Sequence, residues 1–460
     1  MSLVILALGF PVALLLERAR EVDLSITIPF FLIVIWSAIR LSFAAAKVLA
    51  AMPQIVFYLF CYIWLGLAPL LQVQQGGGPL PYYLDGSEYR AAGLLVVFGI
   101  AIYEFSLNAT APNSFRSIAP RAPRPPRAPR DRGFYLLVSL VIVVAIFMIA
   151  TVGGVSALWT SRQEFSAGVY GGGEDKALGA ITSSVLIAPP FVALSALIYR
   201  GQRDEGRLLY SAAIVALLVL NILINNPISQ GRFWFTTVWG VVGIIVIMRL
   251  RVNPWWLPVA FVTATLVVFP NADVFRYAGS SFSNFKLEPA GEQLVDKGDF
   301  DSIQQIALGI RYAADAGFGL GQQSVSTLFF FVPRSIWPDK AIDTGSVLAN
   351  YVGFGNANLS APLWIEGYMD GGLVLTAVFF AGLGLVHKAL RHQNQLTFGA
   401  AIFSFYQLVI LRGSLLASMA TGAVVLAMYL LMTATSNPRS GLPARTRGLG
   451  EREKSRDPLE

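Results

Sequence analysis

The dominant pattern along the chain is the alternation of long apolar runs with short charged segments. A hydrocarbon core of about 30 Å takes roughly 20 apolar residues in a helix, and many of these runs approach that length. The pattern predicts an all-α polytopic membrane protein with about twelve transmembrane helices. The predicted spans are Leu3–Leu16, Leu24–Ile39, Val48–Leu71, Ala91–Leu107, Phe134–Val152, Leu178–Ile198, Leu208–Ile224, Phe233–Met248, Trp255–Pro270, Gly371–Val386, Phe398–Leu411 and Ser414–Met432.

Two of these runs need separate treatment. The first has no basic segment before it and is followed by eleven more, so we expect a retained helix rather than a cleaved signal peptide. The apolar stretch Phe398–Met432 would form a helix of about 52 Å, which is too long for one span. A hairpin that turns at Gly413 is expected instead, and it places Arg412 at the outer face.

Composition excludes an ordinary soluble enzyme, because 55% of the residues are hydrophobic and only 13% are charged. The single cysteine, Cys61, allows neither an internal disulfide nor a cysteine-rich metal site. Glu104 is the one carboxylate within a predicted span, near its cytoplasmic end, where snorkelling explains it. Both histidines, His387 and His392, are assigned to a short cytoplasmic loop. The spans therefore resemble a scaffold more than a proton path.

The positions of the basic residues predict the orientation. If the N-terminus is cytoplasmic, cytoplasmic segments hold 21 of the 34 Lys and Arg residues. Both termini are therefore expected in the cytoplasm. The linker 108–133 contains Pro120–Arg130, a Pro/Arg stretch that cannot bury a core and is expected to be extended near anionic headgroups. An arm that binds nucleic acid is the rival interpretation of this stretch.

The chain divides into four parts. Residues 1–270 carry spans one to nine and the linker, 271–370 form a large extracytoplasmic loop, 371–432 carry spans ten to twelve, and 433–460 form a polar cytoplasmic tail expected to be disordered. The loop contains 11 of the 27 carboxylates and six basic residues. Within it, the apolar spacing of Phe300–Ala316 predicts a helix that lies along the membrane surface or caps a cavity.

Several cations on the predicted outer side are candidate anion ligands. They are Arg232, Arg276, Arg334, Lys340 and Arg412. Interfacial anchoring explains any one of them, but five on one side favour a shared role. A planar guanidinium makes paired hydrogen bonds to phosphate oxygens, so the group suits a lipid-linked diphosphate.

Glycosyl transfer from a diphosphate also needs a group that deprotonates the acceptor hydroxyl. Glu366 lies just before a predicted span, beside Trp364 and Tyr368, whose rings are candidates for stacking on sugars. A helix N-terminal acid is the alternative explanation of Glu366, and Asp370 fits that alternative better. Weaker rivals for the base are Asp273, Asp339 and Asp343.

Evidence for metal or nucleotide chemistry is poor. The triplets Asp299–Asp301 and Glu21–Asp23 each have two acids in a D-x-D or E-x-D spacing, which is common by chance. The glycines of Gly317–Gly321 follow no predicted strand and lie outside the cell, so they do not indicate a nucleotide site. We expect neither a metal nor another cofactor.

Three loop motifs together point to a family. They are Gly319–Ser324 (GLGQQS), Phe331–Lys340 (FVPRSIWPDK) and Pro362–Gly372 (PLWIEGYMDGG), the last directly before a span. With the topology, they resemble bacterial oligosaccharide repeat-unit polymerases of the Wzy type, which are relatives of O-antigen ligases. The specific part of the resemblance covers about 60 residues, and the rest matches in topology only.

This resemblance implies a metal-independent, inverting glycosyltransferase with a GT-C-like fold. It would move a growing glycan from undecaprenyl diphosphate to the next lipid-linked repeat unit at the outer face of the bacterial cytoplasmic (inner) membrane. By position, Arg232, Arg276 and Arg334 look like the diphosphate-binding arginines, Lys340 an accessory cation and Glu366 the base. The further substrate-binding candidates are Arg311, Arg412, Tyr277, Trp337, Trp364 and Tyr368.

The partners implied are undecaprenyl-diphosphate-linked oligosaccharides and the lipid bilayer, with a chain-length regulator left open and no nucleic acid. The ligase branch is less expected, because its members use an outer-loop histidine and this loop has none. Two other functions stay open. One is a glycosyltransferase with a polyprenyl monophosphate donor, metal-dependent at Glu21 and Asp23. The other is a lipid-linked oligosaccharide flippase or transporter, which predicts charged residues lining a cavity through the bilayer.

Overall fold

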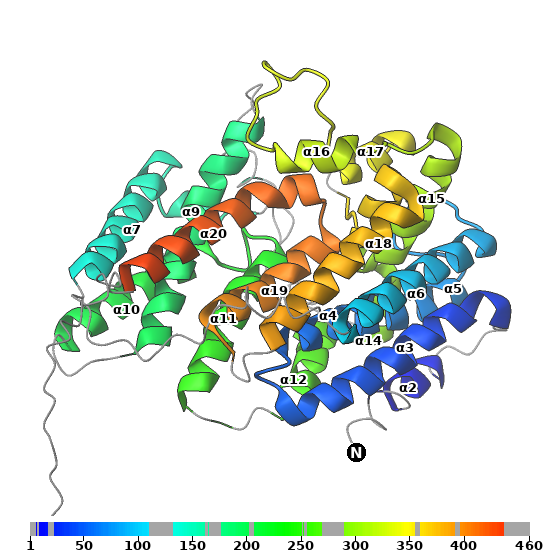
Figure 1. Ribbon diagram of the computed structural model, residues 1–460, viewed down its shortest axis with the longest axis horizontal. Helices are drawn as coiled ribbons and strands as arrows, with labels where there is room; N and C mark the ends of the chain where they lie inside the picture. The colour runs from blue at the N-terminus through cyan, green and yellow to red at the C-terminus, as the bar shows by residue number, and fades with distance from the viewer. Residues whose placement is uncertain are drawn as a thin grey trace, which may run out of the picture.

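The computed structural model is built from helices, which Figure 1 shows as a bundle with shorter helices at one end. No strand occurs among the residues that the structure describes. These are residues 6, 9–16, 23–109, 132–161, 164, 176–201, 207–250, 252, 255–268, 289–354, 359–391 and 396–436. Most of the predicted linker (110–131) and of the predicted tail (437–460) therefore lies outside the described residues, and residues 433–436 of the predicted tail belong to a helix instead.

In this described part, nine helices are long and apolar enough to cross a membrane, and two shorter apolar helices accompany them. The long ones confirm a polytopic membrane protein and match the predicted spans closely. They are α3 (Leu24–Ala44), the run from α4 (Met52–Tyr62) to α5 (Ala68–Gln74), α6 (Gly86–Asn108), α7 (Arg132–Thr151), α9 (Lys176–Arg200), α10 (Arg207–Ile224), α11 (Arg232–Leu250), α18 (Leu363–Arg391) and α20 (Leu415–Ser436).

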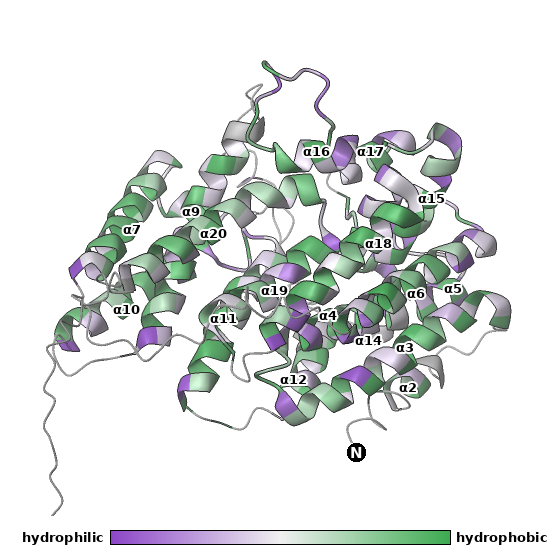
Figure 2. Cartoon of the chain, in the orientation of Figure 1, coloured by the Kyte–Doolittle hydropathy of each residue, from purple (hydrophilic) through white to green (hydrophobic). Residues whose placement is uncertain are grey.

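The shorter apolar helices also coincide with predicted spans. One combines α12 (Leu257–Thr263) with a π-helical turn, Ala264–Val268, and the other is α19 (Phe398–Arg412). The first predicted span is described only in part, as α2 (Phe10–Leu16). Figure 2 shows hydrophobic residues covering helices such as α7 and α20.

The hairpin predicted at the end of the chain is confirmed. Helix α19 ends at Arg412, Gly413 follows it in extended backbone, and α20 begins at Leu415. The side chain of Thr397 caps the start of α19 by accepting a hydrogen bond from the Ala400 N–H. The last residue of α19, Arg412, and the first residue of α20, Leu415, therefore lie in one tight turn.

Helix α18 is two helices joined at a sharp kink rather than one straight span. Gly371 and Gly372 leave helical geometry, and Gly372 has φ 63°, which L side chains rarely adopt. A Cβ on Gly367 would lie only 2.8 Å from the Thr376 Cα, so the two parts fold against each other. The kink separates the predicted span, which begins at Gly371, from the earlier part of the helix, Leu363–Asp370.

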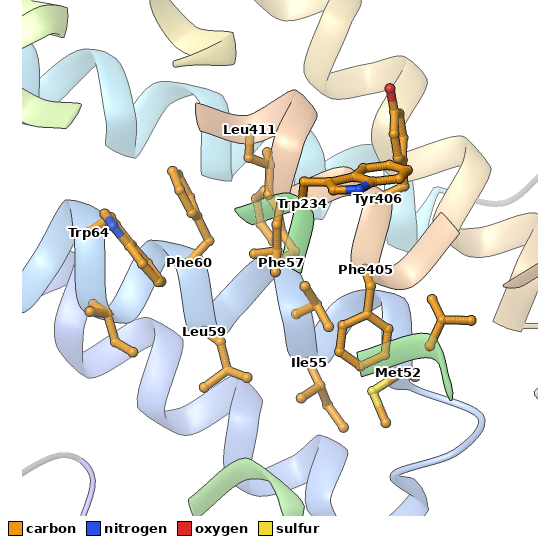
Figure 3. Close-up of a cluster of buried hydrophobic side chains, with 14 of the residues drawn as sticks. Met52, Ile55, Phe57, Leu59, Phe60, Trp64, Trp234, Phe405, Tyr406 and Leu411 are labelled. Carbon is orange, nitrogen blue, oxygen red and sulfur yellow. The ribbon is translucent and has the colours of Figure 1, made fainter. Parts of the chain in front are cut away.

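The core surrounds α4. Every residue of α4 is buried, as expected for a helix that is hydrophobic all round. Figure 3 shows its side chains Phe57 and Phe60 in one buried hydrophobic cluster with Trp234 of α11 and Phe405 of α19. A π-helical segment, Ile63–Leu67, continues α4 into α5 just before Pro69, which has no backbone N–H to donate.

The described part of the long loop is folded and packs on the spans. Its helices are α14 (Ala290–Asp296), α15 (Ser302–Ala316), α16 (Gln322–Leu328) and α17 (Thr344–Tyr351). Helix α14 contacts α5, and α15 contacts α6 and α18. The helix predicted at Phe300–Ala316 is confirmed as α15, but its first half is buried against the spans instead of lying on a surface.

Candidate functional site

The acidic triplet Asp299–Asp301 is the meeting point of two arginines that are far apart in sequence. Arg232 is the first residue of α11, and its Nη1 forms an ion pair with Asp299 Oδ2. Arg412 is the last residue of α19, and its Nη2 lies 3.2 Å from Asp301 Oδ1 and 4.0 Å from Asp299 Oδ1. Two of the predicted anion ligands are thus paired with carboxylates of the chain.

Arg412 also holds the backbone of this segment. Its Nε donates to the Asp299 carbonyl at 3.2 Å, and its Nη2 donates to the Gly298 carbonyl at 3.0 Å. Its Cζ lies 4.9 Å from the ring centre of Phe233, within range of a cation–π contact. The Trp64 indole N–H of the π-helical segment donates to the same Asp299 carbonyl at 2.9 Å. The guanidinium therefore fixes the turn that presents both carboxylates.

The carboxylates are deeply buried, with relative exposures of 9% for the Asp299 side chain and 3% for that of Asp301. Burial raises the pKa of Asp301, against the opposing effects of Arg412 and of the Ser360 hydroxyl, which donates to Asp301 Oδ1 at 2.7 Å. Both carboxylates are thus already paired with donor groups of the protein itself. Across the described residues, no group of three His, Cys, Asp or Glu side chains could hold a metal ion.

Glu366 lies close to the same turn. It occupies the first turn of α18 with 2% relative exposure, and its Oε1 accepts a hydrogen bond from the Leu415 N–H at 3.1 Å. On the preceding side of the turn, the Ala361 N–H donates to the Arg412 carbonyl at 2.9 Å. Arg412 and Glu366 therefore both contact or form the α19–α20 turn, and Arg232 is linked to Arg412 through Asp299.

The aromatic neighbours of Glu366 have different surroundings. Trp364 is fully buried, donates from Nε1 to the Val96 carbonyl at 3.2 Å and packs 4.4 Å from the Phe380 ring. It is thus a core residue between α18 and α6. Tyr368 is half-buried, with its ring centre 5.6 Å from that of Phe318.

Arg334 and Lys340 lie in a loop of their own. Arg334 donates to the carbonyls of Lys340 at 2.5 Å and Ala341 at 2.7 Å. The Lys340 ammonium donates to the carbonyls of Phe330 at 2.6 Å and Val332 at 3.0 Å. Burial, and then the charge of Arg334, lower the pKa of Lys340. Both cations are thus held by carbonyls of their own loop, whereas carboxylates hold Arg232 and Arg412, and Trp337 belongs to the same loop as the two cations.

Arg311 joins two helices. Its Nε and Nη2 contact Glu88 Oε1 and Oε2 of α6, each at 2.5 Å, and Nη2 also donates to the Tyr83 carbonyl at 3.0 Å. The hydrogen bond to Glu88 raises the pKa of Arg311. This forked contact ties α15 to α6. Arg276, Tyr277 and Asp273 lie outside the described residues.

Two further acids of the loop, Asp370 and the rival base Asp343, cap helices. Asp370 accepts from the backbone N–H groups of Gln323 at 3.0 Å and Ser324 at 2.8 Å at the start of α16. It thereby joins two of the three sequence motifs, Gly319–Ser324 and Pro362–Gly372. Asp343 accepts from the Ser346 N–H at 3.0 Å at the start of α17. Asp339 is exposed.

A polar cluster inside the spans was not expected from the sequence. Arg40 of α3 pairs with Glu104 of α6, with Nη2 2.7 Å from Oε2, and Tyr58 of α4 also donates to Glu104. Glu104 is thus ion-paired rather than snorkelling. His387 lies inside α18, not in a loop, with 1% relative exposure and Nδ1 2.7 Å from the Tyr103 hydroxyl. Glu104, the one carboxylate within a predicted span, was the sequence signal for this cluster.

Comparison of the chain with protein-family models, with curated proteins and with solved structures gave no match.

Proposed function

We propose that this protein is a glycosyltransferase that polymerises lipid-linked oligosaccharide repeat units, with a GT-C-like architecture, at the outer face of the bacterial cytoplasmic membrane. It would transfer a growing glycan from undecaprenyl diphosphate to a hydroxyl of an acceptor repeat unit. The observation that supports the proposal is that Arg412 and Glu366 meet at the α19–α20 turn, with Arg232 linked to Arg412 through Asp299.

Each group has a role in such a transfer. When the bond between the sugar and the diphosphate breaks, its electron pair stays on the diphosphate, and guanidinium groups stabilise that charge. The acceptor oxygen forms the new bond to the sugar and loses its proton to Glu366. Arg232 and Arg412 are already paired with Asp299 and Asp301, so a diphosphate must compete with these carboxylates for the same donors.

The test is polymer formation by purified protein in proteoliposomes supplied with lipid-linked repeat units. Arg232→Lys and Arg412→Lys should remove most activity, because an ammonium cannot reproduce the forked contact. Glu366→Gln keeps an acceptor for the Leu415 N–H and should lower turnover by about 10² to 10⁴-fold. The matched control is Arg90→Lys, an exposed arginine of α6, which should leave the glycan ladder unchanged.

Full polymer synthesis by both lysine variants and by the glutamine variant would contradict the proposal. Addition of a chelator separates it from the metal-dependent alternative at Glu21 and Asp23. In the structure Asp23 caps α3, accepting from the Ser25 N–H at 2.9 Å, and Glu21 lies outside the described residues. Activity that disappears with the chelator would favour that alternative.

A lipid-linked oligosaccharide flippase is a second candidate, and the Arg40–Glu104 pair within the spans favours it. In this function the pair would contact the charged headgroup during its passage. Glu104→Gln should then slow the movement of a fluorescent lipid diphosphate across proteoliposomes, while Glu366→Gln should not. Unchanged movement in both variants, with loss of polymer in Glu366→Gln alone, would exclude the flippase.

A further inference from the structure

The segment from Phe318 to Ile336 exposes an unusual number of large apolar side chains outside the long spans. We name these residues the α16 apolar surface. They are Phe318, Leu320, Val325, Leu328, Phe329, Phe331 and Ile336, with relative exposures from 43% to 90%. A concentration of exposed large apolar side chains indicates a binding partner or a membrane.

Leu320 shows that this exposure is built into the backbone. It is the only non-glycine residue with positive φ in the described part of the chain, at 51°, and its side chain is 90% exposed. Backbone hydrogen bonds hold both neighbours: the Gly319 N–H donates to the Met369 carbonyl at 2.8 Å, and the Gly321 N–H donates to the Asp370 carbonyl at 3.1 Å. The anchored glycines present a leucine outward in a conformation that L residues rarely adopt.

The loop after α16 satisfies backbone carbonyls with its own cations and exposes apolar side chains. Lys340, which is buried, donates to the carbonyls of Phe330 and Val332, and Arg334, which is exposed, donates to those of Lys340 and Ala341. Phe331 and Ile336 remain outside, with 57% and 75% relative exposure. A loop in water has no need to satisfy its carbonyls internally, whereas a loop in contact with hydrocarbon does.

The surface adjoins two helices that are candidate membrane spans. Helix α16 contacts α18 and α20, which are both candidate spans. A Cβ on Gly372 would lie 3.5 Å from the Phe318 ring, so this ring lies against the kink of α18. The next two residues of α18, Leu373 and Val374, are 51% and 76% exposed within the span. In Figure 1 the loop after α16 projects beyond the body of the bundle.

We propose that the α16 apolar surface inserts into the bilayer at its edge, in contact with lipid acyl chains. The proposal depends on the fold alone and not on the proposed polymerase activity. Contact with α18 and α20, which are candidate spans, selects lipid over a second protein as the occupant. Insertion would hold Asp370, which caps α16, and with it the first part of α18, Leu363–Asp370, at a fixed depth in the membrane.

Site-directed spin labelling of the full chain in nanodiscs of phosphatidylcholine and phosphatidylglycerol tests this proposal. Cys61 is fully buried, so introduced cysteines at exposed positions can be labelled selectively. The test positions are Leu320→Cys, Leu328→Cys and Ile336→Cys, where the side chains project outward. The matched control is Asn350→Cys, an exposed residue of α17.

We expect labels on the α16 apolar surface to collide more often with oxygen and several-fold less often with a water-soluble nickel chelate than the label at residue 350. Nickel accessibility equal to that of the control would place the surface in water and overturn the proposal. Low accessibility to both reagents would indicate a covering protein, such as a second copy, and would overturn it as well.

Discussion

The pairing of Arg232 with Asp299 leads to a quantitative prediction for the variant Asp299→Asn. The substitution keeps the shape of the side chain and one acceptor oxygen, but it removes the negative charge. Arg232, whose side chain is 11% exposed, then loses the negative charge of Asp299. Arg412 also loses a carboxylate 4.0 Å from its Nη2, although it keeps Asp301 and two backbone carbonyls.

The expected loss follows from this burial. Breaking one partner of a buried ion pair costs about 3 to 5 kcal/mol of unfolding free energy. The lower limit applies here, because the amide oxygen still accepts a hydrogen bond and Arg412 retains other partners. We therefore expect Asp299→Asn to lower the unfolding free energy by about 3 kcal/mol. Combined with Arg232→Gln, the loss should be smaller than the sum of the single losses by about 2 kcal/mol.

The measurement is reversible unfolding in mixed micelles, followed by tryptophan fluorescence, with all four members of the cycle. Asp296→Asn is the matched control, because Asp296 is an exposed acid of the neighbouring helix α14. Its effect should stay within about 0.5 kcal/mol. A loss for Asp299→Asn that equals the control, or single losses that simply add, would refute the reasoning that this ion pair stabilises the fold.

Two further changes test the geometry of α18. Gly372→Ala should destabilise the protein by about 1 to 2 kcal/mol in the same unfolding assay because of the positive φ, whereas Gly382→Ala in the same helix has open space and should be neutral or slightly stabilising. Trp364→Ala should cost about 3 to 5 kcal/mol as a core truncation, whereas a purely sugar-stacking tryptophan would lose activity at normal stability.

The membrane spans were largely predictable from the sequence. Apolar length alone identified the positions of helices such as α7 and α11, since the bilayer imposes that length whatever the packing. The Gly413 turn was predictable for the same reason. Spans interrupted by π-helical turns or kinks were harder to delimit. The first part of α18, Leu363–Asp370, is one example, because its residues are apolar but fold back against the span.

The partners of the charged residues were not predictable. Positive charge and position on the predicted outer side led to Arg334 and Lys340 as anion ligands, and the family resemblance added Arg311, but charge alone does not identify the group that a cation binds. Arg311 pairs with Glu88, which is more than 200 residues away in the sequence, and Lys340 donates to carbonyls of its own loop. Trp364 was expected to stack on sugars because it lies beside a carboxylate. In the helix, however, neighbours in sequence point to different faces, and only the fold shows that its ring enters the core.

Asp299–Asp301 and the two arginines illustrate the same limit with a functional consequence. Read separately, the triplet resembles a weak metal site and the arginines resemble an anion site. In the structure the carboxylates and the arginines pair with one another, and Asp301 is held by both Arg412 and Ser360. A carboxylate and a phosphate oxygen compete for the same guanidinium donors. If Arg232 and Arg412 bind a diphosphate, as we propose, Asp299 and Asp301 set the free energy that the substrate must overcome to enter, because binding requires the exchange of one anion for another.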